Sequence, residues 1–269
     1  MPELPEMETY KTLLTQKVGG QTITNVVINR EKSINVSSDD FIRNVHNQRI
    51  ESIERRAKYL VFQLENGSCL LLHLMLGSLM FFGAEEERPD RTVQIQLTFG
   101  EKHLYFIGLR LGYLHLYTQA EVEQELAGLG PEPLDKNFSL DTFLDQLQHK
   151  RGKLKTTLVD QEFLAGVGNR YSDEIAWHAQ LLPERHVNEF TDQEKSRLYQ
   201  SIRFILQQAI QYGGYMEQPF FNGDTTTGGY IGNTYVYGRK GEACKRCGTP
   251  ITRDKISSRK TFYCTGCQT

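Results

Sequence analysis

Between residues 22 and 117, short apolar stretches alternate with polar turn signals. Each stretch is rich in β-branched and aromatic residues, which favour a pleated, half-buried conformation. The stretches cover residues 22–28, 59–64, 68–76, 78–82, 93–99, 103–107 and 113–117. Turn sequences such as Glu65-Asn66-Gly67 separate them. Several short strands over about a hundred residues predict an antiparallel sandwich or barrel.

After residue 134 the apolar residues recur every three or four positions, which is the period of a helix. This spacing predicts helices at residues 140–148, 171–179 and 191–212. Thr191 followed by Glu194 is a capping box that would begin the longest helix, and Gly213-Gly214 would end it. Shorter helices are expected at residues 8–17 and 38–45.

The chain divides into three parts at two breaks in these patterns. Residues 129–134 contain two prolines and a glycine, which cannot continue a helix and therefore form a linker. A Gly- and Thr-rich stretch after the longest helix precedes the C-terminal cysteines. We expect a β domain over residues 1–128, a helical domain over 129–220, and a loop with a metal module over 221–269.

Charge is distributed unevenly along the chain. The 269 residues carry a formal net charge of −2, but residues 237–269 hold eight basic and two acidic side chains, a net charge of +6. A second basic cluster contains Lys150, Arg151, Lys153 and Lys155. Two separated clusters fit an extended polyanion such as a nucleic acid, and a solvated charged face is the alternative.

The remaining composition excludes several classes of protein. A hydrophobic content of 39% is ordinary for a globular chain and excludes a collagen-like or disordered one. No apolar run approaches the roughly 18 residues of a membrane span. The start, MPELPEMETY, lacks the basic and apolar regions of a secretory signal. We therefore expect an intracellular protein that does not enter a membrane.

Four of the five cysteines have the spacing of a zinc site. Cys244 and Cys247 form one Cys-x-x-Cys pair, and 16 residues separate it from Cys264 and Cys267. Each pair can point two thiolates at one tetrahedral ion. A disulfide framework is disfavoured in a chain without a secretion signal. The spacing predicts one structural zinc ion, which would supply much of this small module's folding energy.

The N-terminus carries candidate chemistry. Removal of Met1 would leave Pro2 with a free secondary amine, which can attack an aldehyde-level carbon and form an iminium. Glu3 and Glu6 lie within reach as acid or base. The alternative is that the glutamates only stabilise the start of a helix. If Met1 is retained, the Pro2 nitrogen is an amide and cannot be the nucleophile.

Four motifs follow one another along the chain: PELPE at the start, Lys58 in RRAKYL, DQEFLAGVGNRYSDE, and YGRKGEACKRCGTP with RKTFYCTGC at the end. Together they closely resemble the formamidopyrimidine-DNA glycosylase family, which includes endonuclease VIII-like enzymes. The resemblance covers essentially the full length. It implies an α+β multidomain fold: an N-terminal antiparallel β-sandwich with an N-terminal helix, a helix-two-turn-helix domain, and a C-terminal zinc-finger β-hairpin.

The resemblance also implies a base-excision repair enzyme that is both a DNA glycosylase and an abasic-site lyase. Pro2 would attack C1′ of the damaged nucleoside and expel the base, and the resulting iminium would permit β- and δ-elimination. Glu3 would assist opening of the sugar ring, and Glu6 would support a proton relay. Lys58 would act beside them and bind a phosphate next to the lesion.

The implied partner is damaged double-stranded DNA. The resemblance implies DNA contacts at Lys58, His73, Met75, Arg110, Lys155, Gly168, Asn169, Tyr237 and Arg259. Met75 and Arg110 would fill the gap that a flipped nucleotide leaves in the base stack. The chain departs from the family pattern here, because the stretch HLMLGSL is one residue shorter and Leu111 stands where phenylalanine is usual.

These departures leave the preferred lesion open. Oxidised purines such as 8-oxoguanine and formamidopyrimidines are the first expectation, and oxidised pyrimidines or bare abasic sites are the alternatives. A second hypothesis is a catalytically weak relative that binds damaged DNA without excising bases. A third is a zinc-ribbon interaction protein with no nucleic-acid role. We expect a monomer associated with the nucleoid, since one chain holds every part.

Overall fold

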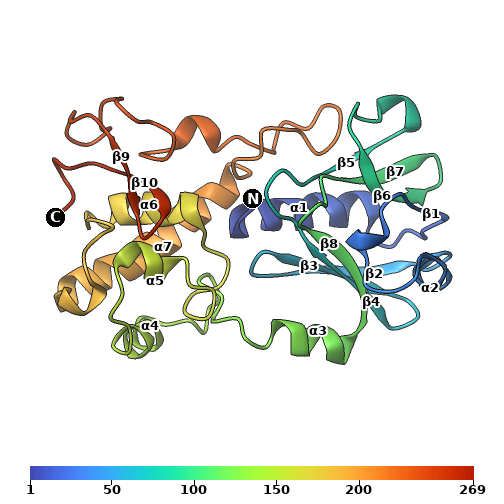
Figure 1. The fold of residues 1–269 in the computed structure, drawn as a ribbon, viewed down its shortest axis with the longest axis horizontal. Coiled ribbons are helices and arrows are strands. Elements are labelled where there is room, and N and C mark those ends of the chain that lie inside the picture. Colours follow the sequence, from blue (N-terminus) through green and yellow to red (C-terminus); the bar gives the residue numbers. More distant parts are fainter. The chain divides into compact units, whose positions relative to one another are not determined.

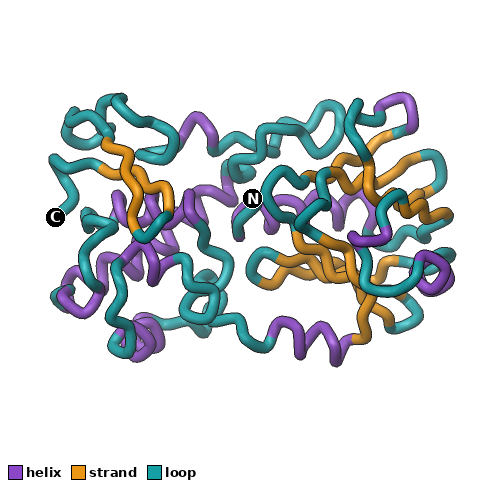
Figure 2. The backbone as a smooth tube through the Cα atoms, viewed as in Figure 1, coloured by secondary structure: helices purple, strands orange, loops and turns teal.

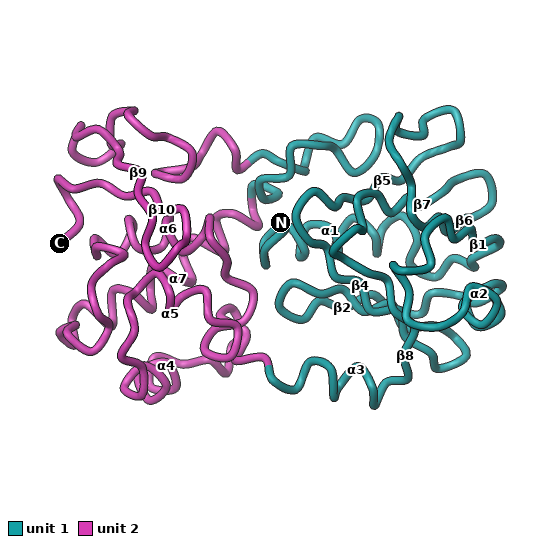
Figure 3. The backbone as a smooth tube through the Cα atoms, viewed as in Figure 1, with its two compact units in different colours: residues 1–128, 212–229 teal, residues 129–211, 230–269 magenta.

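The computed structural model describes residues 1–269, and its chain forms two compact units (Figures 1–3). Unit 1 contains residues 1–128 and 212–229, and unit 2 contains residues 129–211 and 230–269. The first break coincides with the expected linker. The later division differs from the expected one, because residues 212–229 fold with the β region and the metal module shares a unit with the helices.

Unit 1 is built on two four-stranded antiparallel sheets. One sheet has the order β1-β6-β7-β5, formed by Asn25–Ile28, Val93–Phe99, Lys102–Ile107 and Leu79–Gly83. The other has the order β2-β3-β4-β8, formed by Ile50–Arg56, Tyr59–Leu64, Ser68–His73 and Tyr113–Thr118. The predicted β-sandwich is confirmed.

A single apolar core joins both sheets and the first helix. Alternate residues of the strands enter it, such as Leu60 and Phe62 of β3 and Leu104 and Phe106 of β7, as the period of a strand requires. Helix α1 (Leu4–Val18) adds one face, made up of Met7, Tyr10, Leu13, Leu14 and Val18. It begins four residues before the predicted start, because proline is tolerated in the first turn.

Two further helices complete the first part of unit 1. Helix α2 (Ser38–Val45) has the predicted bounds, and the Ser37 hydroxyl accepts a hydrogen bond from the Asp40 N–H at its start. Helix α3 (Gln119–Leu126) follows β8 directly and was not predicted.

The segment 212–229 is anchored in unit 1 by a buried aromatic residue. The Phe220 ring lies in the core, 5.7 Å from the Tyr10 ring and 6.4 Å from the Phe82 ring, measured between centroids. The Phe82 N–H donates to the Phe220 carbonyl at 2.7 Å, so the segment also pairs with the edge strand β5.

Unit 2 contains helices and one hairpin. Its helices are α4 (Leu140–Leu147), α5 (Leu154–Leu158), α6 (Asn169–His178) and α7 (Asp192–Gln211). The Thr191–Glu194 capping box at the start of α7 is confirmed, with the Thr191 N–H donating to Glu194 Oε2 at 2.8 Å. Strands β9 (Thr252–Ile256) and β10 (Arg259–Tyr263) form the hairpin. No helix in the chain is both long and apolar enough to cross a membrane.

Candidate functional site

The N-terminal residues Pro2, Glu3 and Glu6 are buried at the beginning of α1. Glu3 is 2% exposed and Glu6 is 1% exposed, which is unusual for carboxyl groups. The Glu3 N–H donates to Glu6 Oε2 at 2.8 Å, which caps the helix start. The positive end of the helix dipole stabilises negative charge at this position. Pro2 therefore lies next to two buried acids on a rigid element.

Glu6 also holds the beginning of segment 212–229. Its Oε1 accepts a hydrogen bond from the Tyr215 N–H at 3.1 Å. Gly213 and Gly214 have φ values of +72° and +69°, a conformation that favours glycine. A Cβ on Gly214 would lie 2.5 Å from Glu6 Oε1. Glu6 thus bridges the N-terminus and this segment by accepting backbone N–H groups from both.

Lys58 lies in the tight turn between β2 and β3, and only 7% of it is exposed. The preceding Ala57 has a φ of +52°, a strained value for a residue with a Cβ. Arg55 holds this turn, since it donates to the Ala57 carbonyl at 3.1 Å and to Glu8 Oε2 at 2.6 Å. Burial acts to raise the pKa of Glu8, but the hydrogen bonds and charges of Arg55 and Lys11 outweigh it and hold this pKa below its usual value. The turn with Lys58 is thereby tied to α1.

His73 lies at the end of β4, opposite Tyr59 in the neighbouring strand. The two ring centroids are 4.3 Å apart. Burial, with a smaller contribution from the ammonium group of Lys58, lowers the pKa of His73 to about 4. The imidazole is therefore neutral near neutral pH. It can contact DNA by hydrogen bonding, but it does not add a positive charge to the site.

Two loops of unit 1 together present a pair of exposed leucines. Leu76 is 74% exposed and Leu111 is 69% exposed, whereas Met75 is half-buried. The loops lie in direct contact: the Ser78 hydroxyl donates to the Gly108 carbonyl at 2.8 Å. A Cβ on Gly108 would come within 2.3 Å of the Gly77 carbonyl oxygen. An apolar tip on two packed loops can insert between base steps.

Arg110 is exposed next to Leu111, as expected for a side chain that would face an unpaired base. The backbone of its loop is held from one side, because the Ser33 hydroxyl donates to the Leu109 carbonyl at 3.0 Å. From the other side, the Leu109 N–H donates to Gln94 Oε1 at 3.1 Å. Within the two loops, Leu76 is more exposed than Met75. The sequence singled out Met75 for this position and did not single out Leu76.

In unit 2, Asn169 is the first residue of α6 and its side chain is exposed. Gly168 is buried and precedes it in an extended conformation. The first N–H groups of a helix have no partner within the helix and point outward, where they bind phosphate oxygens. The glycine-rich turn and Asn169 therefore have the geometry of a phosphate site.

Lys155 does not occupy the position expected for a DNA contact. It is 0% exposed, and its Nζ lies 2.5 Å from Asp173 Oδ1. The same ammonium donates to the Asn169 carbonyl at 2.7 Å and to Ser172 Oγ at 2.8 Å. An ammonium with three internal acceptors cannot reach a phosphate without breaking a buried ion pair. Lys155 instead orients the backbone of the turn that carries Asn169.

The two adjacent acids of α6 bind the C-terminal module. Asp173 Oδ2 accepts the Phe262 N–H of β10 at 2.9 Å, and burial raises the pKa of Asp173 to about 7 against the effect of Lys155. Glu174 accepts three consecutive N–H groups, those of Tyr235, Val236 and Tyr237, at 2.7–2.9 Å. These contacts hold Tyr237 beside the start of α6, where the Arg170 guanidinium lies 4.5 Å from its ring centroid.

The four predicted cysteine ligands converge. Their Sγ atoms all lie within 4.8 Å of one another, with Cys244 and Cys267 at 3.7 Å and Cys247 and Cys264 at 3.4 Å. A tetrahedral zinc ion with Zn–S bonds of about 2.3 Å separates its sulfur atoms by about 3.8 Å. The cluster therefore fits one structural zinc ion, which would link the two Cys-x-x-Cys turns.

The surroundings of the cluster orient its ligands. The indole N–H of Trp177, on α6, donates to Cys244 Sγ at 3.2 Å. The Trp177 ring stacks on the Tyr235 ring with centroids 4.3 Å apart. The guanidinium carbon of Arg246 lies 4.0 Å from the centroid of the Trp177 ring. Hydrogen bonds from outside the ligand set fix the direction of a thiolate and tune its basicity.

Arg259 is exposed at the first position of β10. The two-residue turn before it, Ser257-Ser258, has φ values of +48° and +64°, as in a type I′ hairpin turn. The hairpin therefore projects a guanidinium from its tip, which suits a bidentate contact with phosphate.

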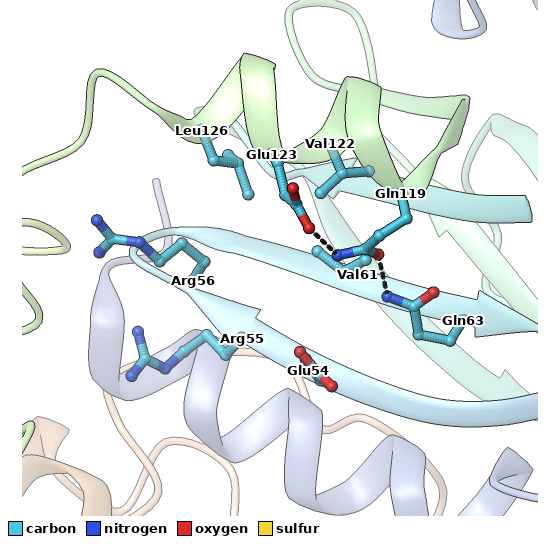
Figure 4. Close-up of a pocket in the computed structure, with 9 residues that line it drawn as sticks. All are labelled: Glu54, Arg55, Arg56, Val61, Gln63, Gln119, Val122, Glu123 and Leu126. Carbon is cyan, nitrogen blue, oxygen red and sulfur yellow. Dashed lines mark hydrogen bonds between the residues drawn. The ribbon is translucent and has the colours of Figure 1, made fainter.

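A hollow of about 270 Å³ in unit 1 contains none of the predicted site residues, although Arg55 and Arg56, which precede Lys58 in its motif, line one side of it (Figure 4). It lies between α3 and the β2-β3 pair. Apolar side chains of Val61, Val122 and Leu126 line it together with Gln119, whose amide donates to Glu123 and accepts from Gln63. Gln63, Gln119 and Glu123 are hydrogen-bonded to one another, and we assign this hollow no part in the chemistry.

Three protein-family descriptions match the chain. These are "Formamidopyrimidine-DNA glycosylase N-terminal domain" over residues 1–113, "Formamidopyrimidine-DNA glycosylase H2TH domain" over residues 129–219, and "Zinc finger found in FPG and IleRS" over residues 241–269. They follow one another along the chain, and the third contains the four cysteines.

Individual proteins match over the whole length. Formamidopyrimidine-DNA glycosylases of Herpetosiphon aurantiacus and Heliobacterium modesticaldum are 35% and 36% identical, each match covering 100% of both chains. A structure of Lactococcus lactis Fpg with DNA containing an abasic site has a TM-score of 0.92 at 29% identity. The wild-type protein of that species with DNA containing N7-benzyl-Fapy-dG gives the same values, and each match covers 99% of both chains.

Proposed function

Because this chain belongs to the formamidopyrimidine-DNA glycosylase family, we propose that it excises oxidised bases through an iminium at Pro2 and then cleaves the strand. It is a DNA glycosylase that repairs oxidised bases. The placement of Pro2 and Glu3 at the buried, capped start of α1 carries the proposal for the mechanism. Removal of Met1 would leave a secondary amine beside a carboxylic acid on a fixed element.

The reaction begins once Met1 has been removed. The lone pair of the Pro2 nitrogen forms a bond with C1′, and the glycosidic bond breaks with its electron pair going to the base, which takes up the proton that the amine loses. The C1′–O4′ bond then breaks as Glu3 protonates O4′, leaving an iminium between Pro2 and C1′. The iminium acidifies the C2′ hydrogen, so the 3′-phosphate leaves by β-elimination and the 5′-phosphate by δ-elimination.

Phosphate contacts hold the DNA without reading its sequence. We assign them to Lys58 in unit 1 and to Asn169, Tyr237 and Arg259 in unit 2. Zinc, when bound by the four cysteines, supports the module that carries Arg259, and it takes no part in the reaction. One chain contains every group required, so we propose a monomer acting on nucleoid DNA.

The proposed substrates are oxidised purines, with 8-oxoguanine and formamidopyrimidines first. A flipped base must leave the stack, and an apolar tip must replace it. Here the tip presents Leu76 and Leu111, with Arg110 beside them to face the orphaned base and set an opposite-base preference. An aliphatic tip fills space but cannot stack as an aromatic ring does.

A second candidate function is damage binding without excision. One observation favours it: Leu111 stands where the family usually has phenylalanine. This change leaves the phosphate contacts intact. This candidate differs from the first in one observable, the covalent intermediate.

Borohydride trapping on a duplex with an abasic site tests the proposal. The protein, with its N-terminal mass measured, should form a covalent adduct with the DNA, and Pro2→Gly should abolish it while its affinity for the same duplex changes little. A processed N-terminus without an adduct would leave the damage-binding candidate in its place.

A further inference from the structure

Tyr215 makes two contacts at the N-terminus, one from its backbone and one from its side chain. Its N–H donates to Glu6 Oε1 at 3.1 Å, and its hydroxyl donates to the Met1 carbonyl oxygen. The residue is half-buried and follows Gly213-Gly214, whose left-handed conformation turns the chain toward α1. The side chain is thus aimed at the atoms attached to the Pro2 nitrogen.

The Met1 carbonyl group stands in for a reaction intermediate. Its carbon is the atom bonded to the Pro2 nitrogen, and the Tyr215 hydroxyl contacts the oxygen on that carbon. When the processed amine adds to an abasic site, C1′ becomes the carbon bonded to Pro2, and the former aldehyde oxygen becomes its substituent. The carbonyl of Met1 therefore marks the region that the C1′ oxygen would enter.

We propose that Tyr215 is a further catalytic residue, whose phenol donates a hydrogen bond to the C1′ oxygen of an abasic site during iminium formation. The inference rests on the proposed function. As the nitrogen lone pair forms the N–C1′ bond, the electrons of the C=O bond move to oxygen, which takes up the proton that the amine loses. The resulting hydroxyl leaves as water, with one further proton, and the nitrogen lone pair closes the iminium.

The same geometry predicts which half of the reaction depends on Tyr215. A donor placed at a developing oxyanion acts only where that oxygen exists. An abasic aldehyde has an oxygen at C1′ besides the ring position, whereas an intact nucleoside carries its base there. Tyr215 should therefore matter more for abasic-site cleavage than for excision of an intact damaged base.

The test is the single-turnover rate of borohydride-trapped adduct on a preformed abasic site. Tyr215→Phe should slow trapping by on the order of 100-fold, as loss of one oxyanion donor does. Its Kd for a duplex with a tetrahydrofuran abasic analogue should not change, because this analogue lacks the C1′ oxygen. If Tyr215 only supported the structure of the segment, Tyr215→Phe would alter this Kd. Tyr212→Phe is the matched control, since Tyr212 lies three residues earlier and is 43% exposed.

Three outcomes would contradict the catalytic role assigned to Tyr215. Trapping by Tyr215→Phe at the wild-type rate would overturn the assignment and leave the iminium at Pro2 intact. An equal loss in Tyr212→Phe, or a weakened Kd in Tyr215→Phe, would reduce Tyr215 to a support of the segment. A wild-type protein with a processed N-terminus that forms no adduct would overturn both the assignment and the proposed mechanism.

Discussion

At the scale of single residues, burial decides what a charged side chain can do. Lys155 belongs to a basic cluster in the sequence, yet its ammonium is enclosed and paired with Asp173. Arg259 belongs to another basic cluster and is exposed. The sequence treats the two alike, because nothing in a run of basic residues shows which member finds an acid 18 positions away in another helix.

Replacing Lys155 by methionine should destabilise the protein strongly. The substitution leaves the carboxyl group of Asp173 buried without its partner, and breaking one side of such a pair costs about 3–5 kcal/mol. Lys155→Met/Asp173→Asn should recover part of this loss, since neither charge then remains unpaired. Urea unfolding of the zinc-loaded wild type, the two single variants Lys155→Met and Asp173→Asn, and the double variant measures the coupling. Strictly additive losses would show that the two side chains do not act as a pair.

At the scale of elements, the apolar pattern predicts the strands whose residues are mostly apolar and misses the strand and the helix that are rich in charged residues. Strands β3 and β6 were predicted with their bounds, because apolar and β-branched residues dominate both and glutamine is the only other residue type in them. Strand β2 was missed, since IESIERR alternates few apolar residues with charged ones and shifts register near its start. Helix α3 was missed because it is short and carries three glutamates.

The hairpin turn Ser257-Ser258 is a local conflict between sequence and structure. Both residues adopt a left-handed conformation, in which asparagine followed by glycine is preferred. Ser257→Asn/Ser258→Gly should therefore raise the Tm of the zinc-loaded protein, corresponding to about 1 kcal/mol. Lys260→Gly, in the neighbouring strand, is the control and should lower it, because glycine weakens a strand. A lower Tm for the Asn-Gly variant would contradict the turn geometry.

The candidate site could be predicted from the sequence where a motif is local. Pro2, Glu3 and the four cysteines are of this kind, and the cysteine cluster forms as expected. The roles of Glu174 and Tyr215 could not be predicted, because each depends on partners about 60 or more positions away in the sequence. Only the pair of adjacent acids directly before the apolar run Ile175-Ala176-Trp177 was a signal for Glu174.

At the scale of the whole molecule, DNA binding has to be reconciled with a slightly acidic chain. The net charge is −2, so long-range attraction of the protein as a whole contributes little to affinity. Binding must come from a few localised phosphate contacts and from the net charge of +6 on residues 237–269. Each such contact releases counterions from DNA, which makes affinity depend on salt.

The number of phosphate contacts can therefore be measured from the salt dependence of DNA binding. The logarithm of the association constant should fall linearly with the logarithm of salt concentration, with a slope of about −0.9 for each phosphate neutralised. Arg259→Ala should make this slope shallower by about one contact and weaken binding similarly for all sequences. Arg253→Ala, an exposed residue of β9 in the same hairpin, is the matched control for loss of general positive charge. Equal slopes for both variants would show that the hairpin acts through its overall charge, and the guanidinium of Arg259 would then have no specific phosphate to bind.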